Sequence, residues 1–497
     1  MKFARFAAVC GIGIALAIVF ASCAGNVTPP DTTAETTAKQ SENTTETEVV
    51  MTETETETET EEIKPEVKTI TVCAPSDKTC RFTVVYDMNG ENPPTAEVNM
   101  LSAMIRNYTG VKVKTKDSSK GATKEIVFSS LSRAETAEMM EELEEGEYAV
   151  RVVDVDGDGR ILIATTTYGS AYACAEYLLE TYYTRENGFC LPVDLDIKGK
   201  EKNYRLVETG IKKLRDPFVL VEDGVYYAYG TGWKCYKNSG GKLKGPWEKV
   251  DVVTNMAHPE TDGGSHWAPE VHKYNGSYYM FTTYLNSKTN HRGCIIMKAD
   301  SPEGPFTEIT DGHITPNDWD CIDGTFYVDP DGQPWMVFVH EWTSMKDGIG
   351  SFAAAKLSDD LTHFISEPIE LFKAKDPVWA TAGVTDGCFM YTTQTGELLM
   401  IWSNFDEFGY SVAVARSDNG RLDGQWTHDG NLLYSKYMTN GYDGGHGMIF
   451  TNLKGQMFLA FHSPNTETED RKEKPVFLAI EERDGKLVWT EKTEKSE

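Results

Sequence analysis

Hydrophobic and polar positions follow three patterns along the chain. Residues 6–21 are almost entirely apolar, whereas residues 23–67 are dominated by Thr and Glu, which alternate between Thr52 and Glu62. A strand in that second segment would have no apolar face to bury, and its like charges repel one another, so we expect a disordered tether. From residue 68 onward, apolar positions recur with the periods of helices and strands, which predicts folded domains.

Residues 68–204 mix both periods and predict a small α+β domain. We expect its strands at 69–72, 82–86, 125–128, 148–155 and 161–165, and its helices at 96–108, 135–144 and 170–183. Ser132 and Glu135 have the spacing of a capping box at the start of the second helix. The acidic run at 154–159 predicts a hairpin turn; the alternative is a calcium loop, but Thr165 stands where such a loop needs a Glu.

Residues 205–497 contain short strands and no long amphipathic pattern. One unit recurs five times: a short apolar strand, a Gly-containing turn and an aromatic-rich strand. All ten Trp residues of the chain lie between Trp233 and Trp489. A repeat of this length made of strands predicts a five-bladed β-propeller. The fold class is therefore a multidomain, mainly β protein, with the propeller at 205–497 and the smaller N-terminal α+β domain at 68–204.

Carboxylates stand at the start of several repeats. In a propeller the innermost strands surround the axis, so the residues at their starts converge. Asp216, Asp323 and Asp386 occupy such positions in register, and Glu270 lies near the matching place in the second repeat. Mutual repulsion raises the pKa of at least one carboxyl, which gives a protonated acid beside an ionised base, as glycoside hydrolysis needs. The alternative is that these Asp residues only cap turns.

Charge and cysteine content exclude two classes of partner and cofactor. The 497 residues hold 48 Lys and Arg against 77 Asp and Glu, a net charge of −29, and no basic patch stands out, so we expect no nucleic-acid partner. Of the ten Cys, Cys10 and Cys23 belong to the N-terminal signal region; the other eight show no spacing typical of a zinc site, so for most of them we expect buried free thiols. Cys73 and Cys80 are the exception, because they bracket a short loop that a disulfide could close.

The N-terminus predicts export. Lys2 and Arg5 precede an apolar run that is too short for a membrane span, which is typical of a secretory signal at residues 1–22. Ala21-Ser22-Cys23 resembles a bacterial lipobox, which implies cleavage before Cys23 and lipidation of its thiol. The protein would then be lipid-anchored at the bacterial cell envelope or surface, with residues 23–67 as its tether. The alternative is an ordinary signal peptide with a chance Cys.

Five short motifs in the propeller region carry a family resemblance. They are Arg215-Asp-Pro-Phe218, His266-Trp-Ala-Pro-Glu-Val271, Ile322-Asp-Gly-Thr-Phe326, Thr385-Asp-Gly387 and Gly444-Gly-His-Gly447. With these motifs, residues 205–490 resemble glycoside hydrolase family 43, a propeller family that acts on arabinose- and xylose-containing polysaccharides. The resemblance implies an inverting α-L-arabinofuranosidase or β-xylosidase with a polysaccharide or oligosaccharide substrate and no required cofactor. Alternatives are a glycosidase for another glycan, such as galactan, and a non-catalytic glycan-binding propeller.

The resemblance also implies roles for the carboxylates. Asp216 would be the general base that activates water, and Asp323 would tune the acid. Asp386 would be the general acid, although the family usually has Glu in a Glu-Gly-Pro context at this position. Because Asp is one methylene shorter, Glu270 or Glu341 is the alternative acid.

Further residues are expected to bind the substrate or an ion. His446 aligns with a family His beside which a water or a structural calcium ion can sit; no other metal is expected. Trp267, with Trp233 or Trp342, is expected to stack on a sugar ring, and Glu270 is a further substrate-binding candidate. Residues 68–204 resemble the small domain ahead of the catalytic unit in α-glucuronidases and β-hexosaminidases, which implies an accessory role.

Overall fold

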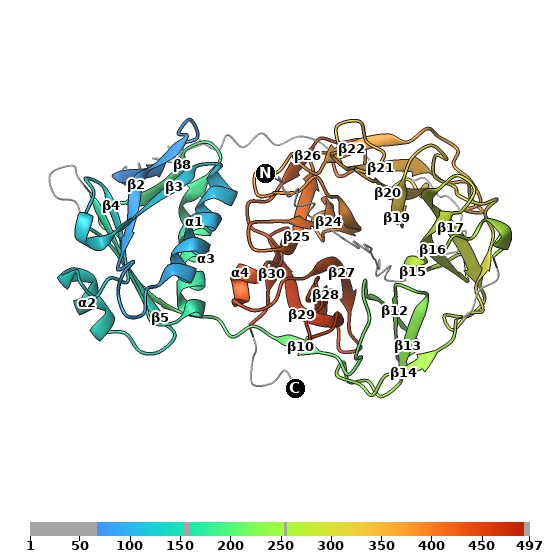
Figure 1. The fold of residues 1–497 in the computed structure, drawn as a ribbon, viewed down its shortest axis with the longest axis horizontal. Helices are drawn as coiled ribbons and strands as arrows, with labels where there is room; N and C mark the ends of the chain where they lie inside the picture. Colours follow the sequence, from blue (N-terminus) through green and yellow to red (C-terminus); the bar gives the residue numbers. More distant parts are fainter. Residues whose placement is uncertain (1–66, 154–158, 253–255, 492–497) are drawn as a thin grey trace, which may run out of the picture.

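The computed structural model describes residues 67–153, 159–252 and 256–491. In this part of the chain a mixed α/β domain lies beside a ring of five antiparallel sheets, as Figure 1 shows. The predicted signal, Cys23, the tether up to residue 66 and residues 154–158 of the predicted hairpin turn lie outside the described residues.

The N-terminal domain is built on a six-stranded sheet in the order β3-β2-β4-β6-β5-β9. Its first four members run parallel, and β5 and β9 run antiparallel to their neighbours. The helices α1 and α3 cover one face and α2 covers the other. A second, small sheet has the order β1-β8-β7. The elements are β1 (Thr69–Cys73), β2 (Thr79–Tyr86), α1 (Thr95–Thr109), β3 (Lys112–Asp117), β4 (Glu125–Phe128), α2 (Ala134–Glu141), β5 (Glu147–Val153), β6 (Arg160–Thr165), α3 (Tyr168–Tyr182), β7 (Tyr183–Thr184), β8 (Gly188–Pro192) and β9 (Asp196–Lys200).

The capping box predicted at Ser132 and Glu135 is wrong. Within the described chain no side chain caps α2, because the Ser132 hydroxyl donates to Asp87 instead. The capping box lies at α3, where Thr167 accepts from the amide of Ser170 at 3.0 Å and the Ser170 hydroxyl accepts from the amide of Thr167 at 3.0 Å. The tertiary partner therefore overrides the local signal at α2.

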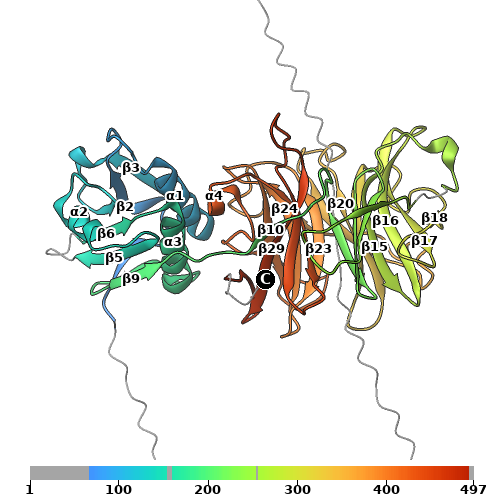
Figure 2. The same cartoon turned by 90° about the horizontal axis from the view of Figure 1, so that it is seen from below.

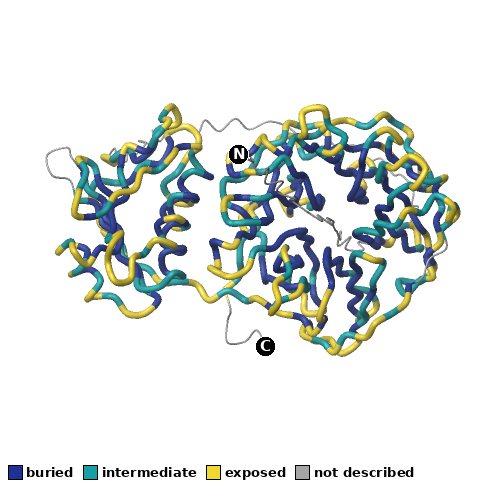
Figure 3. The backbone as a smooth tube through the Cα atoms, viewed as in Figure 1, coloured by how far each residue is buried: buried dark blue, intermediate teal, exposed yellow. Residues whose placement is uncertain are grey.

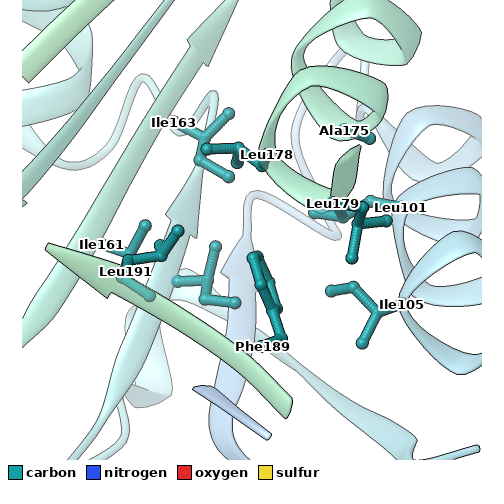
Figure 4. A pocket seen from close by; sticks show the side chains of 10 residues that line it. Leu101, Ile105, Ile161, Ile163, Ala175, Leu178, Leu179, Phe189 and Leu191 are labelled. Carbon is teal, nitrogen blue, oxygen red and sulfur yellow. The ribbon is translucent and has the colours of Figure 1, made fainter. Parts of the chain in front are cut away.

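A small apolar cavity remains between the helices and the sheet of this domain. Side chains from α1 and α3, such as Leu101 and Leu178, point toward Ile161, Ile163 and Phe189 across it (Figure 4). All ten lining residues are apolar. A sugar needs hydrogen-bonding groups, so this cavity is a packing defect of the domain core rather than a glycan site.

The C-terminal part is a five-bladed β-propeller, as predicted. Each of the five sheets is antiparallel; in the first four blades the first strand in the chain is innermost, and in the fifth the innermost strand is β27. Around the ring β12 contacts β15, β16 contacts β19, β20 contacts β23 and β24 contacts β27. The first two blades are β11 (Phe218–Glu222), β12 (Val225–Gly230), β13 (Lys234–Asn238), β14 (Glu248–Val250) and β15 (Trp267–Tyr274), β16 (Ser277–Asn286), β17 (His291–Ala299), β18 (Thr307–Glu308). The next two are β19 (Cys321–Val328), β20 (Pro334–His340), β21 (Ser351–Lys356), β22 (Ile369–Lys373) and β23 (Asp386–Thr392), β24 (Leu398–Phe405), β25 (Tyr410–Ser417), β26 (Trp426–His428).

The fifth blade closes the ring with strands from both ends of the propeller. It contains β27 (Gly445–Thr451), β28 (Met457–Ser463) and β29 (Lys474–Arg483). Two short strands then share the outer edge of β29: β10 (Leu206–Glu208), from the start of the propeller, and β30 (Lys486–Trp489), from its end. Because β11 also contacts β27, the first and last blades are neighbours.

The innermost strands begin with an irregular turn of backbone. In blades two to five the register shifts just after the strand begins, and the residue at the shift has a positive φ: 43° at Ala268, 69° at Asp323, 50° at Gly387 and 66° at His446. Asp216, just before β11, has a φ of 60°. Non-glycine residues rarely adopt this conformation, and such strain is often stored at functional sites. Figure 3 shows that these inner strands are largely buried.

The two domains share a hydrophobic interface. The N-terminal domain packs through α1 and α3 against α4 (Lys436–Thr439) and the last strands of the propeller, as Figures 1 and 2 show. Trp489 lies between Tyr204 at 4.4 Å and Tyr172 at 6.2 Å, measured between ring centroids. The hydroxyl of Tyr168 donates to the carbonyl oxygen of Tyr437. The buried core cluster is therefore continuous across both domains.

The eight cysteines in the described ranges are free thiols, and all but Cys190 are buried. Cys73 and Cys80 are therefore not joined by a disulfide, and the Cys80 thiol donates to the carbonyl oxygen of Val72 at 3.2 Å. Within the described residues, no helix combines the length and the apolarity that a membrane crossing requires.

Candidate active site

Asp216 lies at the axial end of the first blade and is fully buried. The Thr231 hydroxyl donates to its Oδ2. Its Oδ1 lies 3.2 Å from Nδ1 of His462, 3.4 Å from Nε of Arg215 and 3.7 Å from Nδ1 of His446. Thr231 therefore holds Oδ2 of the carboxylate, and the nitrogen atoms of His462, Arg215 and His446 surround Oδ1.

Arg215 is itself fixed by the last blade. Its Nη1 donates to Oε1 of Glu473 at 2.9 Å, and its Nη2 donates to Oδ1 of Asn465 at 2.9 Å. A buried guanidinium with two such partners is rigid, because its planar donors are directed to fixed acceptors. The positive charge beside Asp216 is therefore part of the architecture and partly compensates the carboxylates around it.

Asp323 occupies the equivalent position in the third blade and is also buried. Its amide donates to the Thr283 hydroxyl of the preceding blade at 3.0 Å, and its Oδ2 accepts from the amide of Gly387 at 3.5 Å. Burial raises the pKa of Asp323 well above its usual value, and the charges of Asp386 and Asp216 raise it further. The structure thus places this carboxyl beside both of the others.

Asp386 lies in the same cluster but not in the predicted register. The position equivalent to Asp323 is Gly387, and Asp386 pairs with Ser403 as Ile322 pairs with Val339, one residue earlier. Its Oδ2 accepts from the hydroxyl of Tyr410 at 2.9 Å. Burial raises the pKa of Asp386 well above its usual value, and the Tyr410 hydrogen bond opposes this rise. The one-residue offset brings its shorter side chain to the axis from a different strand position.

Glu270 does not join the three axial carboxyls. It lies two residues beyond the irregular position at Ala268, with no exposed surface, between the inner strands of blades two and three. Its Oε1 accepts from the Thr325 hydroxyl at 2.9 Å and contacts Nε2 of His272. Burial raises the pKa of Glu270 well above its usual value. Its partners tie it to the packing between blades.

Glu341 lies close to the axial carboxyls, at the end of the third blade, and is engaged by Arg292. The Nε of Arg292 donates to Oε2 of Glu341 at 2.7 Å. Burial raises the pKa of Glu341, and Arg292 opposes the rise. Its charge also raises the pKa of Asp386. This carboxyl is therefore near the cluster, with one oxygen held by a guanidinium.

The predicted stacking residues lie together beside blades one to three. Trp233 stacks on His266 with ring centroids 3.9 Å apart, and its Nε1 donates to the Thr282 hydroxyl at 3.0 Å. Trp267 is half-buried, with the Arg292 guanidinium 5.7 Å from its ring centroid. Trp342 is half-buried and follows Glu341 directly. These rings leave part of their surface accessible to a ligand.

His446 is fully buried beside Asp216, and neither of its ring nitrogens has a hydrogen-bond partner among the described residues. Burial lowers its pKa well below the usual value, so the ring is neutral. The His462 ring and the Arg215 guanidinium lie near it and lower its pKa further, and the Ser403 hydroxyl accepts from its amide at 2.8 Å. In the described ranges, no group of three or more His, Cys, Asp or Glu could hold a metal ion.

The cluster has the equipment for acid–base chemistry. One oxygen of each axial carboxyl, Oδ1 of Asp216, Asp323 and Asp386, is buried without a hydrogen bond to any described residue. Unsatisfied buried oxygens are costly, so their occurrence in one cluster indicates a place for solvent or substrate. Raised pKa values at Asp323 and Asp386 keep protons available there at higher pH than in water.

Several residues of the cluster were not predicted from the sequence. Tyr410, His462, Thr231 and Arg292 have no role in the sequence interpretation, and Arg215 entered it only as part of a motif. His462 could have been found by aligning the second strands of the blades, since it stands where Thr283 and Ser403 stand in theirs. Tyr410 begins a third strand, and nothing in the repeat marks that position.

Known proteins resemble this chain mainly over its propeller. A family model described as Glycosyl hydrolases family 43 matches residues 210–486. A probable arabinan endo-1,5-alpha-L-arabinosidase C of Aspergillus niger is 26% identical over 262 residues, which cover 50% of this chain and 74% of that protein. An extracellular endo-alpha-(1->5)-L-arabinanase of Bacillus subtilis is 27% identical over 148 residues, which cover 27% of this chain and 45% of that protein.

Among solved structures, the endo-arabinase from Bacteroides thetaiotaomicron is similar with 33% identity and a TM-score of 0.49, and the match covers 58% of this chain and all of that one. The first of the curated relatives are matched over 39% of their own length, so the chain spans about two fifths of those proteins.

Proposed function

Because the chain belongs to glycosyl hydrolases family 43, we propose that it is an inverting glycosidase that hydrolyses arabinose- or xylose-containing polysaccharides or oligosaccharides. The observation that carries this proposal is the axial cluster of three buried carboxyls, each with one oxygen that accepts no hydrogen bond from a described residue. Arabinan is the first substrate to test, since the curated relatives described above are named for it. Xylan-derived substrates are the second.

In this proposal Asp216 is the general base. Thr231 holds Oδ2 of Asp216, which leaves Oδ1, beside His462 and Arg215, to take a proton from the attacking water. An inverting mechanism needs a water between the base and the sugar, and it needs a protonated acid on the opposite side of the ring. Trp267 and Trp233 would stack on a sugar ring at the entrance.

Asp386 is the general acid of choice among the three candidates. Glu270 is tied to Thr325 and His272 between two blades, and Glu341 is bonded to Arg292 at 2.7 Å. Glu270 also has a raised pKa and an oxygen without a hydrogen bond, but Asp386 lies in the axial cluster with Asp216 and Asp323, where its Oδ1 can hold a proton and deliver it to the leaving oxygen. Asp323, whose pKa the charge of Asp386 raises, would in turn tune the proton on Asp386.

Export and anchoring complete the proposal. Cys23 in the lipobox-like segment would carry the lipid, and residues 23–67 would separate the enzyme from the membrane. The N-terminal α/β domain would be accessory. The Bacillus subtilis relative is named as an extracellular protein, which supports export.

The proposal is tested with linear arabinan, arabino-oligosaccharides, xylan, xylo-oligosaccharides and galactan, with product analysis by chromatography and NMR. We expect release of arabinose or arabino-oligosaccharides, with inversion at the anomeric carbon in the first product. Asp216→Asn protein is the matched control, because it keeps the shape of the site and removes the base. A folded wild-type protein that hydrolyses none of these glycans but is retarded by one of them in affinity electrophoresis would overturn the proposal in favour of a glycan-binding propeller.

A further inference from the structure

The side chain of Tyr410 joins the acid end of the site to the fifth blade. Its hydroxyl donates to Oδ2 of Asp386 at 2.9 Å, and its ring stacks on the ring of His462 with centroids 5.7 Å apart and an interplanar angle of 28°. His462 in turn lies 3.2 Å from Asp216. Both Tyr410 and His462 are fully buried.

The fold is shaped around this tyrosine. The amide of Tyr410 donates to Oδ2 of Asp443 at 3.2 Å, which fixes the start of β25. A Cβ at Gly445 would lie 2.3 Å from Cε1 of the Tyr410 ring, so the ring fits because residue 445 is a glycine. The ring is thereby held in place, and the position of its hydroxyl oxygen relative to Asp386 is set by residues of the fourth and fifth blades.

We propose that Tyr410 is a positioning residue for the proton donor Asp386. The hydroxyl engages Oδ2 as a donor, so in the protonated acid the proton sits on Oδ1, which has no partner among the described residues. Oδ1 gives that proton to the leaving oxygen as the glycosidic bond breaks, and the carboxylate that results keeps the Tyr410 hydrogen bond. The inference rests on the proposed function, because it takes Asp386 as the acid.

A short acid makes such a partner necessary. Asp has one rotatable bond fewer than the Glu that the family usually has here, so it reaches less far. Its direction must be set by what holds its second oxygen. The charged and titratable groups that face Asp386 are Arg215, Asp216, Asp323, Glu341 and Tyr410. Of these, Tyr410 is the group within hydrogen-bond distance of an Asp386 oxygen in the described structure.

The test compares Tyr410→Phe with wild type on two substrates. One is an arabino-oligosaccharide, whose alkoxide leaving group needs a proton, and the other is a nitrophenyl arabinofuranoside, whose leaving group departs without one. We expect kcat on the oligosaccharide to fall about 10- to 100-fold, which is the scale of one hydrogen bond to a charged group, and to fall far less on the nitrophenyl substrate. Phe keeps the ring stacked on His462, so a merely structural role predicts equal losses on both substrates.

Two further proteins keep the test decisive. Tyr229→Phe is the matched control, since Tyr229 is a fully buried tyrosine whose hydroxyl donates to the carbonyl oxygen of Pro302, away from the carboxyls. It should affect both substrates alike. In an Asp386→Asn background, Tyr410→Phe should cost nothing more on the oligosaccharide, because the group it positions is gone.

Equal losses on both substrates, or full additivity in the double variant, would overturn the inference. If wild type hydrolyses neither substrate, the proposed function itself fails, so the two failures are distinguishable. Should Tyr410→Phe fail to fold, Asp386→Glu decides: a longer acid changes the distance to Tyr410, and its kcat should fall on the oligosaccharide only. Equal kcat values for Asp386→Glu and wild type on the oligosaccharide would contradict positioning by Tyr410.

Discussion

Asp323 and Gly387 are linked by a hydrogen bond that has no counterpart in the other described blades. The amides of Asp323 and His446 donate to the hydroxyls of Thr283 and Ser403 in the preceding blade, at 3.0 and 2.8 Å. The residue at the matching place for Gly387 is Val339, which has no hydroxyl. The Gly387 amide donates to Asp323 Oδ2 instead, at 3.5 Å, so the strand that carries Asp386 is connected to the neighbouring carboxyl of Asp323.

Restoring the missing hydroxyl should weaken catalysis. In Val339→Thr, the new hydroxyl is expected to accept the Gly387 amide, and Asp323 loses a hydrogen bond that opposes the rise of its pKa. We expect kcat to fall about 3- to 10-fold with KM unchanged, the scale of one modest hydrogen bond. Val337→Thr, two residues away on the same strand, is the control and should leave kcat within the error of wild type. A Val339→Thr enzyme with wild-type kcat would show that the link has no catalytic role.

The acid and the base should respond differently to the leaving group. Asp386→Asn should lose about 10²–10⁴-fold in kcat on an arabino-oligosaccharide and much less on a nitrophenyl substrate, because the phenolate departs without a proton. Asp216→Asn should fail on both, since water must be activated in either reaction. Glu270→Gln and Glu341→Gln are run beside them. If one of these two spares the nitrophenyl substrate and Asp386→Asn does not, the acid lies in that Glu.

Removing the charge of Asp386 should stabilise the fold. Burial raises the pKa of Asp386 above its usual 3.8, so the folded state binds more protons than the unfolded state between these values, and stability falls as pH rises through that window. Asn carries no charge, so the stability of Asp386→Asn should not fall with rising pH for this reason. We expect a higher melting temperature at neutral pH, by roughly 2–4 °C for each kcal/mol, and no gain below pH 3.8.

The control for that measurement is Asp359→Asn, a change at an exposed position on the third blade. Its melting temperature should follow the wild-type pH profile. A melting temperature for Asp386→Asn that stays at or below wild type at every pH would contradict a strained, buried carboxyl at this position.

The interface between the two domains should control whether they unfold together. Trp489 packs against Tyr172 and Tyr204, and its Nε1 donates to the carbonyl oxygen of Leu433 at 2.7 Å. Trp489→Ala should cost about 3 kcal/mol and split a single calorimetric transition into two.

Trp335→Ala is the matched control for this change. Trp335 is also half-buried, with its Nε1 donating to Asp329 at 3.0 Å, but it lies within the third blade. This variant should shift the transition without splitting it. Two transitions in wild type, or in both variants, would show that Trp489 does not couple the domains.

Lipidation is tested at Cys23. Cys23→Ser should move the protein from the membrane fraction to the soluble fraction of the expressing bacterium, since a single hydroxyl cannot accept the lipid that the thiol carries. Cys190→Ser changes a partly exposed thiol elsewhere in the chain and should stay with the membrane. Membrane association of the Cys23→Ser protein at the wild-type level would refute the lipobox interpretation.

The repeat pattern was enough to predict the propeller, since alternating strands and Gly turns recur with the blades. It also placed Asp216 and Asp323 correctly at equivalent positions. It assigned Asp386 one position out of register. The sequence does not show where the register shift in this strand lies, and that shift makes Gly387 the residue equivalent to Asp323. The pattern also missed β3, β8 and β9 of the N-terminal domain. The strand β3 is the clearest case: its three lysines alternate with Val113, Thr115 and Asp117, so it has no apolar face of its own, and it is held by pairing with β2.

Tyr410 and His462 could not be inferred for a different reason. Their importance comes from contacts between blades, such as the stacking of their rings, and those contacts depend on the closed ring rather than on any local pattern. Glu270 shows the converse. Its place in a motif suggested a site residue, whereas its hydrogen bonds to Thr325 and Phe326 place it between two strands.

The pairing of β10 with β29 closes the ring, and its long sequence separation bears on the order of folding steps. The pairing joins Leu206 to Leu478 and Glu208 to Val476, and beside it the Thr209 hydroxyl donates to the carbonyl oxygen of Pro475, 266 positions away. Contacts of such long range form late, because the intervening chain must be ordered first. Asp216 gains His446 and His462 as neighbours in that same final step. A chain whose last blade has not yet formed therefore lacks the His446 and His462 neighbours of Asp216, and the carboxyl cluster is complete only once the ring is closed.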